Sequence, residues 1–532
     1  MWEALMQKES MSRIRQKTKK VKQSGGRVLF RLIFGRTMIT VLLLLLQILC
    51  LIGIFRMVGL SENLLTISNL LGMAAIIYII NSEENPAFKL TWVLPICLVP
   101  VFGIGFYLFI ILNPGNRGLQ KLLNRRKDET KPYLRTEYRV LEKLKKESSG
   151  IRNLGHYIQN QNGFPTCDHT NVTFFATGEE KYADLLKELE RAEQFIFLEY
   201  FIINQGEVWD HVLEILERKA KAGVEVRVMY DGMCALVSLP YRYPQQLRER
   251  GIKAKMFSPI KPLLSTHQNN RDHRKIAVID GRVAYNGGIN LADEYMNVKK
   301  RFGHWKDTAV KLEGEAVRSF TVMFLQMWYM TEAGEGEYEK YLPHFEAPAA
   351  SGYVIPYNDD PINRLDIAES VYLDMLYKAK KYVHIMTPYL IIDNELITAL
   401  TYAARRGVDV KLILPHIPDK KIIFAIARTY YPQLLEAGVK IYEYTPGFVH
   451  AKEFVSDDKK AVVGSINLDF RSLYEHFECA TFIYKNPAIL DIEKDYQETL
   501  KKCQKIDMQF CVDLPLWYRI GGHIFRLFGP LV

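Results

Sequence analysis

Two stretches of the chain carry the same five residue types at the same spacing: histidine, then lysine two, aspartate seven, glycine fourteen and asparagine seventeen positions later. The first copy is His273, Lys275, Asp280, Gly287 and Asn290, and the second is His450, Lys452, Asp457, Gly464 and Asn467. A single histidine–lysine pair carries little information, whereas agreement at five positions predicts a duplicated site. Lysine and histidine inside a protein are costly unless they are used, so their repetition indicates chemistry rather than scaffold.

The chemistry that suits these side chains is transfer of a phosphodiester. Two histidines, two lysines and two asparagines around one point would supply charge-assisted donors to the phosphate oxygens. One imidazole can attack phosphorus while the other protonates the departing alkoxide and then accepts a proton from the incoming hydroxyl. The reaction requires no metal ion, and no spacing typical of metal ligands occurs, so we expect neither a metal nor another cofactor.

Two further acids are candidates for holding the imidazoles. Asp307 and Glu478 each stand two residues before an alanine that opens a strand-like run, one after each motif. A carboxylate there can bind the second ring nitrogen of a histidine and fix its tautomer. The alternative is that they are ordinary acids at strand ends. We expect Asp280 and Asp457, although part of the catalytic motif, to be structural because an apolar strand separates each from its lysine.

The elements that must position these residues also repeat. Strand-like runs at 195–203 and 224–230 enclose a helical pattern at 209–222 that ends at Gly223, and runs at 382–392 and 408–414 enclose one at 395–406 that ends at Gly407. Such alternation predicts an α/β fold with parallel or mixed sheets flanked by helices. With 177 residues between the two histidines, we expect two similar lobes around a pseudo-twofold axis.

In the region before the lobes, apolar stretches are flanked by basic segments. Long apolar stretches cover 38–55, 64–80 and 90–112, and the first and third are long enough to span a bilayer of ~30 Å. We therefore predict a basic cytoplasmic tail (1–37), two or three membrane spans (38–113), a basic linker (114–150), two catalytic lobes (151–345 and 346–511) and an amphipathic tail (512–532). That tail either lies at a membrane interface or packs as an ordinary helix on the body.

Charge favours a membrane partner over nucleic acid. The net charge is +10, with ten Lys and Arg against two acids in residues 1–36 and eleven against five in 115–147. Basic segments beside apolar stretches are typical of contact with anionic lipid on the cytoplasmic side. Basic residues on both flanks fit an even number of crossings, which leaves the topology open; we favour a cytoplasmic catalytic body. Seven unpatterned cysteines indicate a reducing compartment.

The paired motif resembles the phospholipase D superfamily, and within it the bacterial cardiolipin synthases. Further shared runs are Glu199-Tyr200-Phe201, Asp231-Gly232, His304-Trp305-Lys306-Asp307, Asn467-Leu468-Asp469-Phe470-Arg471-Ser472 and the tail from Arg526 to Leu531. The resemblance implies a multi-pass protein of the bacterial cell membrane that makes cardiolipin and glycerol from two phosphatidylglycerol molecules through a phosphatidyl-histidine. It further implies His273 as nucleophile, His450 as acid and base, and phosphate binding by Lys275, Lys452, Asn290 and Asn467.

Three other functions stay open at this point. The same site would hydrolyse phosphodiesters if water reached the intermediate, would serve a nuclease if the basic patches bound nucleic acid, or would be idle in a membrane scaffold. The apolar stretches count against nucleic acid, which we do not expect as a partner. The sequence leaves the preferred lipids and the oligomeric state undetermined.

Overall fold

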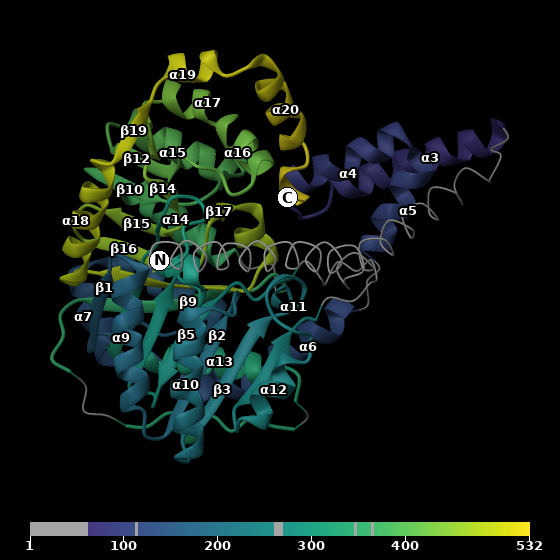
Figure 1. The fold of residues 1–532 in the computed structure, drawn as a ribbon. Coiled ribbons are helices and arrows are strands. Elements are labelled where there is room, and N and C mark those ends of the chain that lie inside the picture. The colour runs from purple at the N-terminus through teal and green to yellow at the C-terminus, as the bar shows by residue number, and fades with distance from the viewer. Residues whose placement is uncertain are drawn as a thin grey trace, which may run out of the picture.

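A computed structural model describes residues 62–111, 115–259, 270–332, 334–344, 348–362 and 366–531. Figure 1 shows two lobes, one built by the earlier and one by the later part of the chain, with an arm of apolar helices projecting beside the C-terminus. The apolar stretch at 38–55 lies outside the described residues.

The first lobe is built on a mixed sheet of seven strands in the order β1-β8-β6-β5-β2-β3-β4. The chain alternates strand and helix from β2 to β4, and these strands are parallel; β5, β6, β8 and β1 join as antiparallel neighbours. The strands are β1 (Thr170–Phe175), β2 (Phe195–Tyr200), β3 (Glu225–Asp231), β4 (Lys253–Phe257), β5 (Lys275–Ile279), β6 (Val283–Gly287) and β8 (Ala309–Gly314).

The second lobe repeats this sheet. Its order is β9-β18-β16-β15-β10-β12-β13, with β19 added at the edge, so strand for strand it matches the first sheet. The strands are β9 (Tyr353–Asp359), β10 (Tyr382–Met386), β12 (Asp409–Pro415), β13 (Lys440–Tyr444), β15 (Glu453–Ser456), β16 (Lys460–Gly464), β18 (Glu478–Tyr484) and β19 (Cys503–Ile506). The predicted two-lobed α/β fold with mixed sheets is confirmed.

The predicted helices and their ends are also present. Helix α10 (Glu207–Lys221) ends before Gly223 and α15 (Asn394–Arg405) before Gly407, and both glycines take a left-handed conformation. The predicted strand at 382–392 is interrupted: β10 is followed by the short β11 (Leu390–Ile391). Pro388 lies in the gap and has no N–H to donate to a neighbouring strand.

A shared apolar core joins the two lobes. Helix α13 (Val317–Tyr329) is buried along almost its whole length in a cluster that includes residues of both sheets, such as Val278 and Val463. Helices α7 (Tyr138–Glu147) and α8 (Ser149–Asn162) belong to the core of the second lobe, although they precede or begin the stretch predicted as the first. Residues on both sides of position 151 therefore pack against the second sheet before the chain enters the first.

The apolar stretch predicted as one span at 90–112 is broken. It forms α4 (Pro86–Leu98) and α5 (Pro100–Ile111), which pack with α3 (Glu62–Ile80) around Trp92, Ile96 and Tyr107. Pro100 prevents a continuous helix, and a Cβ on Gly103 would lie 2.6 Å from the Ile96 backbone, so the two helices nearly touch. Among the described residues, no helix combines the length and apolarity needed to cross a bilayer.

Candidate active site

Each motif histidine is held by the acid of the other lobe. Nδ1 of His273 donates to Glu478 at 2.7 Å, and Nδ1 of His450 donates to Asp307 at 2.6 Å. Both carboxylates are fully buried. Because the protons lie on Nδ1, the Nε2 lone pairs are left for chemistry. Asp307 and Glu478 thus each contact a motif imidazole, but that imidazole belongs to the opposite lobe and not to the acid's own copy.

Main-chain pairing between the lobes explains the crossing. Strand β7 (His304–Lys306) runs parallel to β14 (Gly447–Val449), and the His450 amide donates to the Lys306 carbonyl. At the other motif, the His273 amide donates to the Phe477 carbonyl at 2.9 Å. The backbone amide of each histidine is therefore hydrogen-bonded to the residue that immediately precedes the acid of the other lobe.

A glycine makes room for one acid and a serine binds the other. A Cβ on Gly288 would lie 2.1 Å from Asp307 Oδ1, so any larger residue there would displace the carboxylate. Its counterpart in the second motif is Ser465, whose hydroxyl donates to Glu478. The two halves of the site are thus similar in geometry but not identical in chemistry.

Both motif lysines are buried behind their histidines. The ammonium groups of Lys275 and Lys452 donate to the carbonyls of His273 and His450, respectively. Burial lowers the pKa of Lys275 to about 8 and that of Lys452 to about 7, while nearby Asp307 and Glu478 act in the opposite direction. The pKa values of both lysines therefore lie close to neutral pH.

Burial also sets the protonation of the catalytic pairs. It lowers the pKa of both His273 and His450 well below the ordinary value, with the cationic lysines adding to the effect. It raises the pKa of Asp307 to about 6, whereas the charge and hydrogen bond of His273 outweigh burial at Glu478 and hold the pKa of that carboxyl below its usual range. Near neutral pH the pairs therefore rest as neutral imidazole and carboxylate.

The two imidazoles line one cavity of about 600 Å³. Aromatic and aliphatic side chains form part of its wall, and cationic side chains lie among them. The apolar and aromatic members are Phe201, Ile202, Met233, Tyr295, Phe302, Trp305, Tyr389, Ile391 and Ile423, and the cations Arg271, Arg301, Lys420 and Arg471 outnumber the carboxylates Glu294, Asp419 and Asp469. Such a cavity suits a ligand that is anionic at one point and apolar elsewhere.

The two motif asparagines occupy different positions. Asn467 lines the cavity, and its carbonyl oxygen is buried with no hydrogen-bond partner among the described residues. Asn290 instead accepts from the Ile202 amide and donates to the Tyr295 hydroxyl. The structure thus brings Asn467 to the site directly, whereas Asn290 supports Tyr295, which is a lining residue.

The motif aspartates lie away from the cavity. Asp280 accepts from the amides of Glu193, Gln194 and Phe195, which open β2, and Asp457 accepts from those of Lys380, Lys381 and Tyr382, which open β10. Both take a left-handed backbone conformation at a hairpin turn. They fasten equivalent strands in the two lobes, which agrees with the structural role predicted for them.

Sequence reasoning missed His476 and Arg271. His476 lies two residues before Glu478, in the place that Trp305 takes before Asp307, and its ring centroid is 5.4 Å from that of His273. Arg271 lies two residues before His273 and lines the same cavity. A comparison of the two copies beyond the five matched positions would have singled out His476 as a difference between them.

One group of side chains at the active site could hold a metal ion. One ligand atom each of His273, His476 and Glu478 lies within 4.8 Å of the others, although the sequence spacing predicts no such cluster. Glu478 is already committed to His273 and Ser465, so a metal would have to displace the pairing that holds the imidazole.

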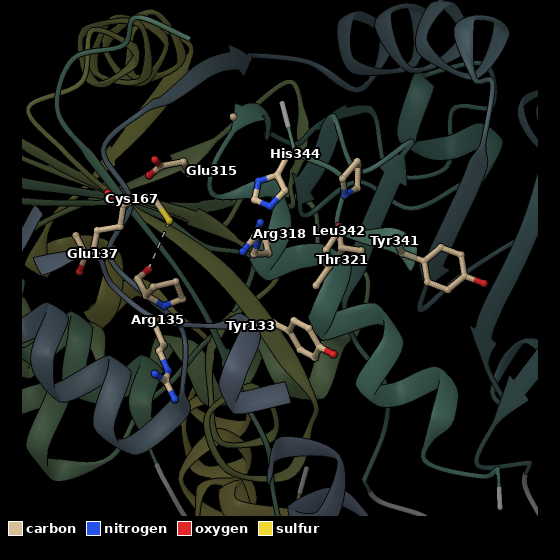
Figure 2. A pocket seen from close by; sticks show the side chains of 15 residues that line it. Tyr133, Arg135, Glu137, Cys167, Glu315, Arg318, Thr321, Tyr341, Leu342 and His344 are labelled. Carbon is tan, nitrogen blue, oxygen red and sulfur yellow. Dashed lines mark hydrogen bonds between the residues drawn. The ribbon is translucent and has the colours of Figure 1, made fainter. Parts of the chain in front are cut away.

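A second cavity lies apart from this chemistry. It has a volume of about 310 Å³ and is lined by residues such as Arg135, Glu315 and Arg318, as Figure 2 shows. In this view Cys167 points to the Pro165 carbonyl, 3.9 Å from its sulfur. Gly281, which follows Asp280, is one of the lining residues, but none of the matched motif residues lines this cavity. The cavity is therefore separate from the reaction centre.

Comparison with known proteins gives a consistent result. A family described as "Cardiolipin synthase, PLD-like domain" matches residues 185–328 and 372–500, and one described as "Phospholipase_D-nuclease N-terminal" matches 70–110. A cardiolipin synthase of Geobacillus sp. is 35% identical over 86% of this chain and 91% of its own length. One of Alkalihalophilus pseudofirmus is 33% identical with the same coverage.

Two other similarities complete the comparison. An uncharacterized protein of Streptococcus mutans is 50% identical over 86% of this chain and its entire own length. The crystal structure of a phosphatidylserine synthase from Haemophilus influenzae superposes with a TM-score of 0.53 over 72% of this chain and 99% of its own, at 14% identity, which supports the fold. With two interlocked lobes around one pair of histidines, the chain belongs to the cardiolipin synthase family of phospholipase D-like phosphatidyltransferases.

Proposed function

We propose that this chain transfers a phosphatidyl group from one phosphatidylglycerol to another, giving cardiolipin and glycerol through a phospho-histidine. The observation that carries the proposal is the crossed arrangement of two imidazole–carboxylate pairs facing one cavity. Two neutral imidazoles whose Nδ1 protons are held leave two Nε2 atoms, one to attack and one to manage the proton.

The reaction divides into two displacements. The reaction starts from the form in which His450 has taken up a second proton on Nε2, which an anionic phosphate beside the ring would favour. Nε2 of His273 attacks phosphorus, and the bond from phosphorus to the glycerol oxygen breaks as His450 gives that proton to the oxygen. The 3'-hydroxyl of the second phosphatidylglycerol then loses its proton to His450, and its oxygen displaces His273. The buried cations Lys275 and Lys452 would stabilise the charge that gathers on the phosphate oxygens, and Asn467 would donate to them.

The apolar arm (α3 to α5) and the C-terminal tail support the proposal that the enzyme acts at a bacterial cell membrane. Ile77 on α3 and Leu98 on α4 are exposed, as are Trp517 and Ile524 on α20 (Leu516–Arg526). Helix α20 also packs on the body, since a Cβ on Gly522 would lie 2.7 Å from the Ala425 carbonyl oxygen. Figure 1 places the tail next to α4. We propose that this surface contacts lipid and that the catalytic body is cytoplasmic.

Anionic phospholipid is the substrate class that the cavity favours. Its cationic side chains match the phosphate, and Ile391 and Ile423 provide an apolar wall where acyl chains would begin. Ile423 belongs to α16 (Lys421–Arg428), which packs against the tail helix, so the apolar wall is continuous with the proposed lipid-facing surface.

The test is purified full-length enzyme on vesicles of phosphatidylglycerol labelled in its headgroup glycerol. We expect cardiolipin and free labelled glycerol in equal amounts, and neither product from His273→Ala or His450→Ala. Phosphatidic acid without cardiolipin would instead show a hydrolase, and cleavage of DNA without action on lipid a nuclease. In a second assay with phosphatidylglycerol labelled in its phosphate, covalent label retained by His450→Ala but not by His273→Ala would support His273 as nucleophile.

A further inference from the structure

The duplicated site has two chemically different ends. Beside His450 stands Trp305, whose ring lies 5.2 Å from the imidazole. The equivalent position beside His273 is His476, at 5.4 Å. Duplication alone predicts equal ends, so an indole at one and an imidazole at the other is a difference that calls for a cause.

His476 is buried without a use in the chemistry described so far. Only 9% of it is exposed, and neither ring nitrogen has a hydrogen-bond partner among the described residues. Its Nδ1 lies 3.9 Å from Glu478 Oε1, too far for a hydrogen bond. A buried imidazole with both nitrogens unpaired is unfavourable unless a ligand completes it.

Arg271 and Arg471 are two of the three arginines that line the same cavity. Arg271 is 5% exposed, and its Nη1 donates to the Ser258 carbonyl at 2.9 Å and to Asp231 at 3.5 Å. A guanidinium carries five N–H donors in a planar fork that matches a phosphate. Burial lowers the pKa of Arg271, and the positive charge of Arg471, which lines the same cavity, adds to that effect. An anion between them would oppose that effect.

We propose that Arg271, Arg471 and His476 form a second anion subsite, which binds the phosphodiester of the acceptor phospholipid. The proposal rests on the proposed function. Cardiolipin synthesis involves two phosphates: one reacts between the imidazoles, and the other stays intact one glycerol unit away. A duplicated fold supplies the symmetric reaction centre, and the asymmetric end supplies the place for the phosphate that does not react.

The subsite would decide which hydroxyl takes the phosphatidyl group. Free glycerol and acceptor phosphatidylglycerol present similar hydroxyls, but only the latter carries an anion next to it. Binding that anion brings the 3'-hydroxyl to the phosphoryl group and raises its effective concentration there. Loss of the subsite should therefore weaken transfer to phosphatidylglycerol more than transfer to free glycerol.

The experiment measures both acceptors in one reaction. Phosphatidylglycerol vesicles are incubated with the enzyme and labelled free glycerol, and two rates are recorded: cardiolipin formation, and entry of label into phosphatidylglycerol. For Arg271→Gln, Arg471→Gln and His476→Ala we expect the ratio of cardiolipin formation to exchange to fall roughly 10- to 100-fold, as for loss of a hydrogen bond to a charged group. Arg271→Lys, which keeps the charge, should recover part of the ratio.

The control is Arg218→Gln. Arg218 lies on α10 outside this cavity, its side chain is 60% exposed and it pairs with Glu190 at 2.5 Å, so the ratio should stay within about twofold of that of the unchanged enzyme. Parallel loss of both rates in the three subsite variants would show a structural role and overturn the proposal, as would an unchanged ratio. A wild-type enzyme that exchanges glycerol but forms no cardiolipin would refute the proposed function instead.

Discussion

Replacing Asp307 with asparagine should disable His450, although His273 is much nearer in sequence. The Asp307 carboxylate is fully buried and accepts from His450 Nδ1 at 2.6 Å. Asparagine keeps the shape but removes the charge that stabilises the imidazolium, and its NH₂ group can donate to Nδ1 and force the proton onto Nε2.

The size of the effect follows from these two losses. A hydrogen bond to a charged group contributes about 1.5–3 kcal/mol, which corresponds to roughly 10- to 150-fold in the step that needs protonated His450. The wrong tautomer adds to this, and the same change in a serine-protease triad lowers kcat about 10⁴-fold. We therefore expect kcat to fall between roughly 10²- and 10⁴-fold, with little change in KM.

The assay pairs kinetics with nuclear magnetic resonance of ¹⁵N-labelled histidine. In Asp307→Asn, the His450 nitrogens should report a changed tautomer and a pKa that falls further, because the opposite charge is gone. The His273 signals should stay as they are, and Glu478→Gln should give the mirror image. The crossed arrangement is refuted if Asp307→Asn perturbs His273 and spares His450, or if kcat falls less than tenfold.

Three further predictions follow from the same geometry. Gly288→Ala, whose Cβ would lie 2.1 Å from Asp307 Oδ1, should lower kcat at least tenfold without loss of expression; near-normal kcat would show that the carboxylate can shift. Asp280→Ala, which removes the acceptor of three backbone amides, should lower unfolding stability by about 1–3 kcal/mol in a thermal melt while the folded fraction keeps its kcat. The pH profile of kcat/KM should fall below about 6 as Asp307 is protonated, and above about 7 as Lys452 loses its charge; Asp307→Asn should abolish the acid limb and move the alkaline limb to lower pH, because the Asp307 charge raises the Lys452 pKa.

The sequence determined the local elements and the chemistry. Short strand-like runs and helical spacing located β2, α10 and β3 and their repeats within a few residues, because those patterns reflect burial on a single strand or helix. The five matched positions predicted His273 and His450 together in a duplicated site, since side-chain chemistry and spacing are properties of the chain itself. The structural role of Asp280 was also predictable, from the apolar strand that separates it from Lys275.

Only the tertiary structure decided which groups meet. That Glu478 binds His273 and Asp307 binds His450 depends on strand pairing between the lobes, whereas proximity in the sequence favours the opposite pairing. Asn290 and Asn467 have the same place in their motifs, yet one supports Tyr295 and the other lines the cavity, because the lobes differ in what surrounds the turn. Chain-local patterns describe what a residue can do, whereas contacts between distant segments, fixed by packing the two lobes together, decide what it touches.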